Sequence, residues 1–256
     1  MYVKNIQMKI SRDKLVAVWN DTKKYCEELK LLVQPSLKIN INLLPNVGNN
    51  PNDHDIPMVK ISNVDCLNMA LQCVNTGMNP MVLNMASDYT PGGGVSIGCP
   101  AQEEEIFRCS NAHMTHPIIF YPLANNEVIY SPQVTIVKNG RANNYSRCVP
   151  FTVGMIACAA IRDPVLVDGK YCENDYRVMY EKIKSLFIIG IHKKHDALVL
   201  GAFGCGAFNN PPHEVANLFY EMVRKYGKYF KFIGFPILCV RKTDENNLIA
   251  FRQKFT

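Results

Sequence analysis

The chain has 256 residues, with 28 Lys and Arg against 22 Asp and Glu, which gives a net charge of +6. This length can bury an extensive core in one large α/β domain or two small ones. The charge is too mild and too scattered to indicate nucleic-acid binding, although it attracts anions such as phosphates. No apolar run approaches the roughly 20 residues that span a bilayer, and the first residues lack the apolar core of a secretory signal.

The ten cysteines show no CxxC spacing, and several lie in apolar, strand-like runs. We therefore expect reduced thiols and an intracellular protein, cytoplasmic or nuclear. No repeat, low-complexity tract or Gly/Ser linker divides the chain, so a single domain over residues 1–256 is predicted.

The first predicted element is an amphipathic helix over residues 11–32. Ser11 is a plausible cap, and Leu15, Trp19, Cys26 and Leu29 recur at helical spacing. We expect this helix to pack on the main body as an N-terminal accessory.

Apolar runs then alternate with helical patterns along the chain. The predicted strands are 37–41, 58–62, 81–86, 127–131, 134–138, 149–158, 196–203 and 232–240, and the predicted helices are 63–76, 101–114, 172–192 and 211–226. Several strands are continuously hydrophobic, as expected where helices cover both faces of a sheet. The pattern predicts a three-layer α/β/α fold with a mixed central sheet, because the strands within 127–138 come as near neighbours.

Two glycine-rich loops each follow a predicted strand and precede a predicted helix. The first contains Gly92, Gly93 and Gly94, and the second, GAFGCGAFNNPP, begins at residue 201. Ligands collect at the carboxyl ends of such strands, and bare backbone amides bind anions, usually phosphate. Tight turns alone are the other explanation, but two loops in the same orientation favour a ligand.

Neither loop matches a standard nucleotide motif. The second reads G-x-x-G-x-G, with only one helix and one strand expected after it, and no G-x-x-x-x-G-K-[ST] string occurs. The sequence therefore predicts a phosphate-bearing ligand but not a Rossmann or P-loop site.

Gln102, Glu103 and Glu104 begin the predicted helix 101–114, followed by Glu105. Acidic residues are common in a first turn because they complement the helix dipole. The glycine loop just upstream favours a ligand-binding site instead, because it would bring a ligand to the same end of the helix. Adjacent helical residues point about 100° apart, so at most two of the three glutamates can face one ligand. The helix terminus lowers the pKa of a carboxyl group there, whereas a bound diphosphate would raise it and allow acid catalysis.

These motifs together carry a family resemblance. VLNMAS-x3-PGGG, followed after seven residues by QEE, and then GAFGCGAFNNPP resemble the microbial-type poly(ADP-ribose) glycohydrolases, a branch of the macrodomain superfamily. The resemblance covers about residues 58–240 as a macrodomain core, with residues 1–57 as the accessory segment. It implies hydrolysis of the ribose–ribose glycosidic bond of poly(ADP-ribose), with ADP-ribose released mainly from chain ends. The alternatives are a non-catalytic ADP-ribose-binding macrodomain and a mono-ADP-ribosyl hydrolase.

The resemblance also implies roles for individual residues. Glu104 would be the catalytic acid, and Glu103 would hold ribose hydroxyls. Asp65 is either an adenine contact or a helix N-cap. The resemblance places Gly92, Gly93 and Gly94 around the distal ribose and a phosphate, Gly204, Cys205, Gly206 and Ala207 at the diphosphate, and Phe208 beside the distal ribose. The other residues predicted to bind substrate are Ala86, Ser87, Val95 and Gln102. A third glutamate after QEE departs from the family pattern and leaves the role of Glu105 open.

No cofactor and no metal are expected. HMTH (113–116) and HKKH (192–195) each pair two histidines three residues apart but lack a third ligand, so surface or capping histidines are predicted. The expected partners are poly(ADP-ribose) or ADP-ribosylated proteins as substrate and ADP-ribose as product. We expect a monomer that binds neither membranes nor DNA directly.

Overall fold

The computed structural model describes residues 10–48 and 57–256. Its centre is a seven-stranded sheet with the strand order β1-β4-β5-β3-β8-β9-β2. The strands are β1 (Leu37–Asn40), β2 (Met58–Ser62), β3 (Pro80–Met85), β4 (Glu127–Lys138), β5 (Arg147–Cys158), β8 (Ala197–Val199) and β9 (Phe232–Pro236). Five neighbouring strands from β5 to β2 run parallel, whereas β4 is antiparallel to β5 and to β1. The predicted mixed sheet is confirmed.

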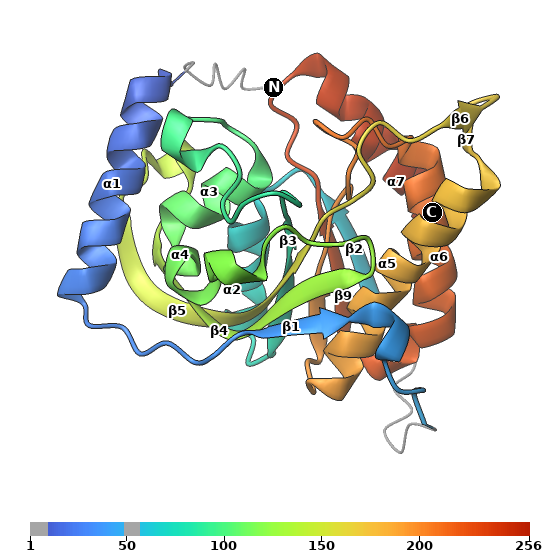
Figure 1. The fold of residues 1–256 in the computed structure, drawn as a ribbon, viewed down its shortest axis with the longest axis horizontal. Coiled ribbons are helices and arrows are strands. Elements are labelled where there is room, and N and C mark those ends of the chain that lie inside the picture. Colours follow the sequence, from blue (N-terminus) through green and yellow to red (C-terminus); the bar gives the residue numbers. More distant parts are fainter. Residues whose placement is uncertain (1–9, 49–56) are drawn as a thin grey trace.

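Helices cover both faces of this sheet (Figure 1). One layer holds α1 (Arg12–Glu28), α2 (Cys66–Asn75), α3 (Gln102–Cys109) and α4 (Ala112–Thr115), and the other holds α5 (Glu173–His192), α6 (Pro212–Tyr226) and α7 (Glu245–Phe255). Each layer has its own buried apolar cluster. Alternate residues of β3 enter opposite clusters, since Met81 and Leu83 pack toward α5 and Val82 toward α2. The three-layer α/β/α architecture is confirmed.

The predicted N-terminal helix forms and packs directly on the helix that carries the glutamates. Ser11 caps α1 by accepting a hydrogen bond from the backbone of Lys14. Trp19 packs against Phe107 of α3, with ring centroids 6.0 Å apart. Thr22 adds a hydrogen bond to the backbone oxygen of Arg108. The accessory segment thus supports α3, and its β1 extends the sheet; residues 1–9 and 49–56 lie outside the described part.

Several element boundaries differ from the prediction. Residues 127–138 form one strand with a register shift between Ser131 and Val134, and the predicted helix 101–114 divides into α3 and α4. Only 197–199 of the predicted strand 196–203 pair in the sheet. Leu200, Ala202 and Phe203, which follow them, are buried as part of the loop. An apolar run predicts burial, but a buried run does not have to pair as a strand.

Two helices, α6 and α7, follow the second glycine-rich loop, although only one helix was predicted there. Helix α7 places Phe251 against Phe235 of β9, with ring centroids 5.2 Å apart. A small hairpin, β6 (Leu166–Val167) and β7 (Lys170–Tyr171), was also not predicted. No helix in residues 10–48 or 57–256 is long and apolar enough to cross a bilayer.

The parallel direction of β3, β5 and β8 brings three loops to one edge of the sheet. These loops follow Met85, Cys158 and Val199, and the first and third are the two glycine-rich loops. The fold therefore places the two loops at the carboxyl edge where α/β proteins bind ligands.

Replacement of Trp19 tests whether α1 is an integral support for α3. Trp19→Ala removes the ring that packs on Phe107 and leaves a cavity, so we expect the free energy of unfolding to fall by about 3 kcal/mol. Urea denaturation measures this, with the exposed Lys24→Ala on the same helix as control. Equal stabilities of the two variants would contradict an integral role for α1.

Candidate active site

The carboxylates of Glu103 and Glu104 are both buried, with 3% and 7% of each residue exposed. One oxygen of Glu103 accepts hydrogen bonds from the Gly92 N–H (3.0 Å) and the Asn84 amide (3.4 Å), and the other accepts from the Ser87 N–H (2.7 Å). The Oε1 atom of Glu104 accepts from the Gly94 N–H at 2.8 Å. Its Oε2 is buried and has no hydrogen-bond partner in residues 10–48 and 57–256. Glu104 therefore keeps one oxygen available for chemistry.

The three consecutive glycines are required by this arrangement. Gly93 has φ 51°, and a Cβ there would lie 2.8 Å from Glu104 Oε1 and 3.0 Å from Glu103 Oε2. Gly92 has φ 75°, and its Cβ would strike the ring of Phe107. Only glycine combines the left-handed backbone with such close approach.

The N–H groups of all three glycines donate hydrogen bonds to acceptors of the protein itself. Gly92 and Gly94 bind the two carboxylates, and Gly93 donates to the Thr90 oxygen at 3.2 Å. In this structure the glycine loop holds the carboxylates rather than presenting free amides. Contact of this loop with a ribose or phosphate stays a prediction.

Gln102 ties the start of α3 to the end of β3. Its Oε1 accepts from the Met85 N–H at 2.9 Å, and its Nε2 donates to the Leu83 oxygen at 2.7 Å. Both groups of the amide thus bind strand backbone, so Gln102 fixes where the helix begins. The substrate contact predicted for Gln102 is untested.

Glu105 points away from the other two glutamates, as the 100° spacing requires. The Tyr145 hydroxyl lies 2.7 and 2.8 Å from its two oxygens, and Arg108 and Arg141 each form an ion pair with it at 3.4 Å. The fully buried Arg108 also donates to the backbone oxygen of Cys99, just ahead of α3. Glu105 therefore joins α3 to the turn between β4 and β5.

Burial raises the pKa of Glu103 from its usual 4.5 to about 8. The neighbouring Glu104 charge raises it further, whereas the N–H groups of Ser87 and Gly92 and the Asn84 amide oppose the shift. Burial dominates because removing a carboxylate from water costs more than these neutral donors return. At neutral pH the Glu103 side chain is mostly protonated.

Asn210 holds the second glycine loop in shape. Its buried amide donates to the backbone oxygens of Ile161, Gly204 and Phe208, and its Oδ1 accepts from the Tyr171 hydroxyl at 2.8 Å. Gly204 has φ 75°, and a Cβ there would lie 2.5 Å from the Asn210 amide. These hydrogen bonds fix the backbone of the second glycine loop.

The backbone amides of this loop differ from those of the first. The Cys205 N–H donates to the Ala202 oxygen at 3.1 Å. The N–H groups of Gly204, Gly206, Ala207 and Phe208 meet no acceptor among the described residues. The second loop, unlike the first, has free donors for an anion.

The other predicted residues lie around these two loops. Asp65 caps α2 by accepting from the Leu67 N–H at 2.8 Å, so the N-cap role is realised, while contact with adenine is untested. Ala86 and Val95 are buried and donate their N–H groups to Cys158 and Gly92, respectively.

Sequence reasoning missed Asn84, Asp88, Tyr121 and Arg162. Asn84 binds Glu103, and the Tyr121 hydroxyl is buried without a hydrogen-bond partner among the described residues. Burial raises the pKa of Tyr121, and the charge of Glu103 raises it further. Arg162 pairs with Asp88 at 2.6 Å. Only Asn84 and Asp88, which flank the MAS motif, had a sequence signal.

His116 and His195 are both buried. His116 is the C-cap residue of α4, with its Nδ1 3.0 Å from the Ala112 oxygen, so the capping prediction is confirmed there. The prediction of a surface or capping histidine is wrong for His195. His195 instead lies 2.9 Å from the Tyr130 hydroxyl, with its other ring nitrogen near the Asn79 oxygen. In the part of the chain that the structure describes, no three His, Cys, Asp or Glu side chains are grouped to hold a metal ion.

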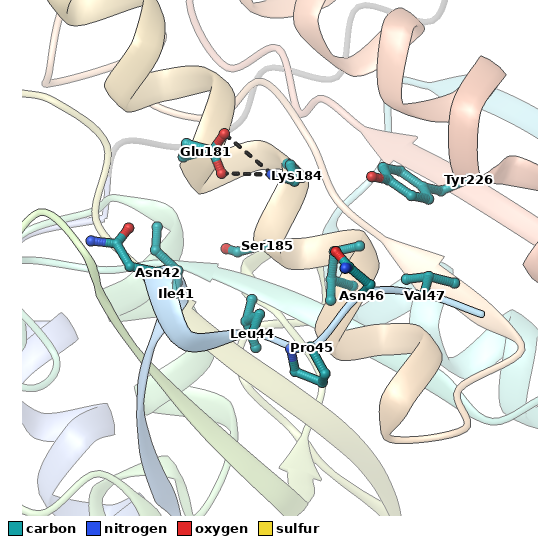
Figure 2. A pocket seen from close by; sticks show the side chains of 11 residues that line it. Ile41, Asn42, Leu44, Pro45, Asn46, Val47, Glu181, Lys184, Ser185 and Tyr226 are labelled. Carbon is teal, nitrogen blue, oxygen red and sulfur yellow. Dashed lines mark hydrogen bonds and ion pairs between the residues drawn. The ribbon is translucent and has the colours of Figure 1, made fainter.

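A cavity of about 360 Å³ lies away from these groups, between the segment after β1 and helices α5 and α6 (Figure 2). Its lining includes Asn42, Pro45 and Tyr226 and the Glu181–Lys184 ion pair. It contains none of the predicted site residues. We assign the site to the two loops because the buried carboxylates and free amides lie there.

The profile of the family described as microbial-type PARG, catalytic domain, where PARG stands for poly(ADP-ribose) glycohydrolase, matches residues 3–139. The match spans more than half of the chain and includes both glutamates, so the chain belongs to this family. The resemblance predicted from the motifs is confirmed, and it extends further toward the N-terminus than residue 58. A comparison with curated proteins finds no match.

Solved structures share the fold. PARG from Thermomonospora curvata superposes with a TM-score of 0.83 and 21% identity over 95% of this chain and 100% of that chain. Its complex with the inhibitor ADP-HPD gives 0.81 and 22% over the same shares. PARG from Deinococcus radiodurans in complex with ADP-ribose gives 0.68 and 23% over 79% of this chain and 85% of that chain.

Two alanine variants separate backbone strain from the carboxylate contact. Gly77 and Gly93 both have positive φ, but a Cβ at Gly77 meets nothing within 4 Å. We expect Gly77→Ala to cost about 1–2 kcal/mol of stability and to leave ligand binding and turnover unchanged. Gly93→Ala, which displaces both glutamates, should also lower kcat/KM about 100-fold. Equal kinetics for the two variants would contradict the proposed function of the glycine loop.

The pH dependence of stability tests the protonation of Glu103. Its pKa is about 8 in the folded protein and 4.5 when exposed, so between these values the folded state binds more protons than the unfolded state. The free energy of unfolding should therefore fall as pH rises from 4.5 to 8, by at most ~1.4 kcal/mol per unit. Urea denaturation of the wild type and Glu103→Gln measures the difference, which should shrink to a constant above pH 8. Parallel curves across the whole range would show that Glu103 is ionised throughout.

Proposed function

We propose that this protein hydrolyses the ribose–ribose glycosidic bond of poly(ADP-ribose) and releases ADP-ribose mainly from chain ends. Membership of the microbial-type PARG family supports this activity. We assign Glu104 as the catalytic acid because its buried Oε2 has no partner among the described residues. Its Oε1 is held by the same glycine loop that binds Glu103.

The hydrogen bonds of Glu104 determine where its proton would lie. Oε1 accepts the Gly94 N–H, so in the protonated acid the hydrogen occupies Oε2. From there Glu104 protonates the departing ribose oxygen as the glycosidic bond breaks through an oxocarbenium-like state. Water then attacks the anomeric carbon, and the Glu104 carboxylate takes the proton that water loses.

The remaining roles follow from the two loops. Glu103, mostly protonated at neutral pH, can donate to or accept from a ribose hydroxyl. The free amides of Gly204, Gly206 and Ala207 hold the diphosphate, whose charge stabilises the developing positive charge on the ribose. Phe208 packs beside the distal ribose.

The substrate in this proposal is poly(ADP-ribose) or an ADP-ribosylated protein, and the product is ADP-ribose. All ten cysteines are free thiols, which supports a reducing, intracellular location. We propose that the protein acts as a monomer.

Glu104→Gln keeps the shape of the side chain but cannot supply the acid proton. We expect kcat on poly(ADP-ribose) to fall by about 10²–10⁴-fold, with the Kd for ADP-ribose within about threefold of the wild type since a contact worth less than 0.7 kcal/mol is lost. Release of free ADP-ribose and calorimetric titration measure the two quantities.

Glu105→Gln is the matched control, because Glu105 lies on the same turn but faces Tyr145 and Arg108. It should lose stability, by about 1–3 kcal/mol, while most turnover is kept. If Glu105→Gln abolished turnover and Glu104→Gln did not, the acid would be misassigned. A wild type that binds ADP-ribose but releases none from the polymer would instead be a binding macrodomain. Release only from mono-ADP-ribosylated protein would identify a mono-ADP-ribosyl hydrolase.

A further inference from the structure

Arg162, in the loop after β5, bridges the two glycine-rich loops. Its Nε and Nη2 atoms both donate to Oδ1 of Asp88, at 2.8 and 2.6 Å, and Asp88 follows the strand that leads to the glycines. On the other side its guanidinium carbon lies 3.9 Å from the ring centroid of Phe208. The exposed Tyr89 ring lies 5.2 Å away. The guanidinium therefore lies between residues of the two glycine-rich loops.

The neighbouring backbone fixes Arg162 beside the free amides of the second loop. The N–H of the next residue, Asp163, donates to the Phe208 oxygen at 3.0 Å, and the Asn209 amide donates to the Asp163 carboxylate at 2.6 Å. These hydrogen bonds join the segment that carries Arg162 to the segment that carries the unpartnered N–H groups of Ala207 and Phe208. A cation and free backbone amides together form an anion site.

The Arg162–Asp88 ion pair leaves hydrogen-bonding groups unused on both side chains. Both bonds go to one carboxylate oxygen, and among the described residues Nη1 has no acceptor within hydrogen-bond distance. About 39% of the arginine side chain and 28% of the aspartate side chain are exposed. Exposed ion pairs contribute little to stability, so Asp88 can be replaced by a stronger acceptor. A phosphate suits the forked guanidinium better than a single carboxylate oxygen does.

We propose that Arg162 is a specificity-determining residue that binds a substrate phosphate, and that Asp88 occupies the guanidinium until the phosphate replaces it. This inference rests on the proposed function and adds to it a side-chain cation that selects phosphorylated ligands. Phe208 holds the guanidinium plane in place by stacking.

The test compares Arg162→Met, Arg162→Lys and Asp88→Asn by titration with ADP-ribose at about 0.05 and 0.3 M salt. Methionine keeps the apolar contact with Phe208 but removes the charge, so we expect Kd to rise about tenfold, the loss of one charged hydrogen bond. Lysine, a point charge without the fork, should recover part of this loss. Asp88→Asn should tighten binding. The Kd of the wild type should rise with salt more steeply than that of Arg162→Met.

Arg177→Ala, an exposed arginine on α5 paired with Glu173, is the matched control and should bind like the wild type. An unchanged Kd for Arg162→Met overturns the inference. Equal weakening in the Met and Lys variants with unchanged salt dependence also overturns it, because Arg162 would then act only by packing.

Turnover of poly(ADP-ribose) by the wild type separates this inference from the proposed function. If the wild type cleaves the polymer and Arg162→Met binds ADP-ribose equally well, only the role of Arg162 fails. A wild type that binds ADP-ribose without cleaving the polymer contradicts the hydrolase, and Kd of Arg162→Met still decides the inference. Absence of ADP-ribose binding in the wild type overturns both.

Discussion

The whole site depends on the need to pair two buried carboxyl groups with hydrogen-bond partners. Glu103 and Glu104 lie side by side out of water, where an unpaired polar group is costly. Most of the donors are main-chain N–H groups, those of Ser87, Gly92 and Gly94. Gly93 has to be glycine because a Cβ there would lie inside van der Waals distance of both glutamates, 2.8 Å from Glu104 Oε1 and 3.0 Å from Glu103 Oε2. Among the described residues, Oε2 of Glu104 is left without a partner.

The surrounding fold fixes the helix that presents these carboxylates. Gln102 binds the backbone of β3, Trp19 of α1 packs on Phe107, and Glu105 joins the far side of α3 to the turn after β4. Helix α3 is thus held at its start, along its outer face and on its opposite side. Rotation about its axis would break at least one of these contacts, so the direction of Glu104 is determined before substrate arrives.

Local patterns predicted the order of elements and the residues that gather at the sheet edge, because apolar periodicity and glycine position are local signals. They could not predict the partners of Glu105, since Tyr145 lies 40 residues away and the turn that carries it has no motif. Helix α7 was missed because its first residues are Glu and Asn, and its apolar contact with β9 is tertiary. Arg162 was missed because a single arginine after a strand has no distinctive spacing.

The two glycine-rich loops look alike in sequence but differ in what their amides bind. The Gly92 and Gly94 N–H groups of the first loop donate to the protein's own glutamates, whereas the N–H groups of Gly204, Gly206, Ala207 and Phe208 in the second loop meet no acceptor among the described residues. A buried acid needs donors that are already in place, whereas an anionic ligand brings its own acceptors and needs donors that are unoccupied. A buried acid therefore requires glycine-loop N–H groups that are already hydrogen-bonded, and an anion site requires glycine-loop N–H groups that are free. Arg162 contacts Asp88 on one side and Phe208 on the other, so it lies between the two loops. In the proposed function, a diphosphate bound at the second loop would direct its ribose toward Glu104 beside the first loop.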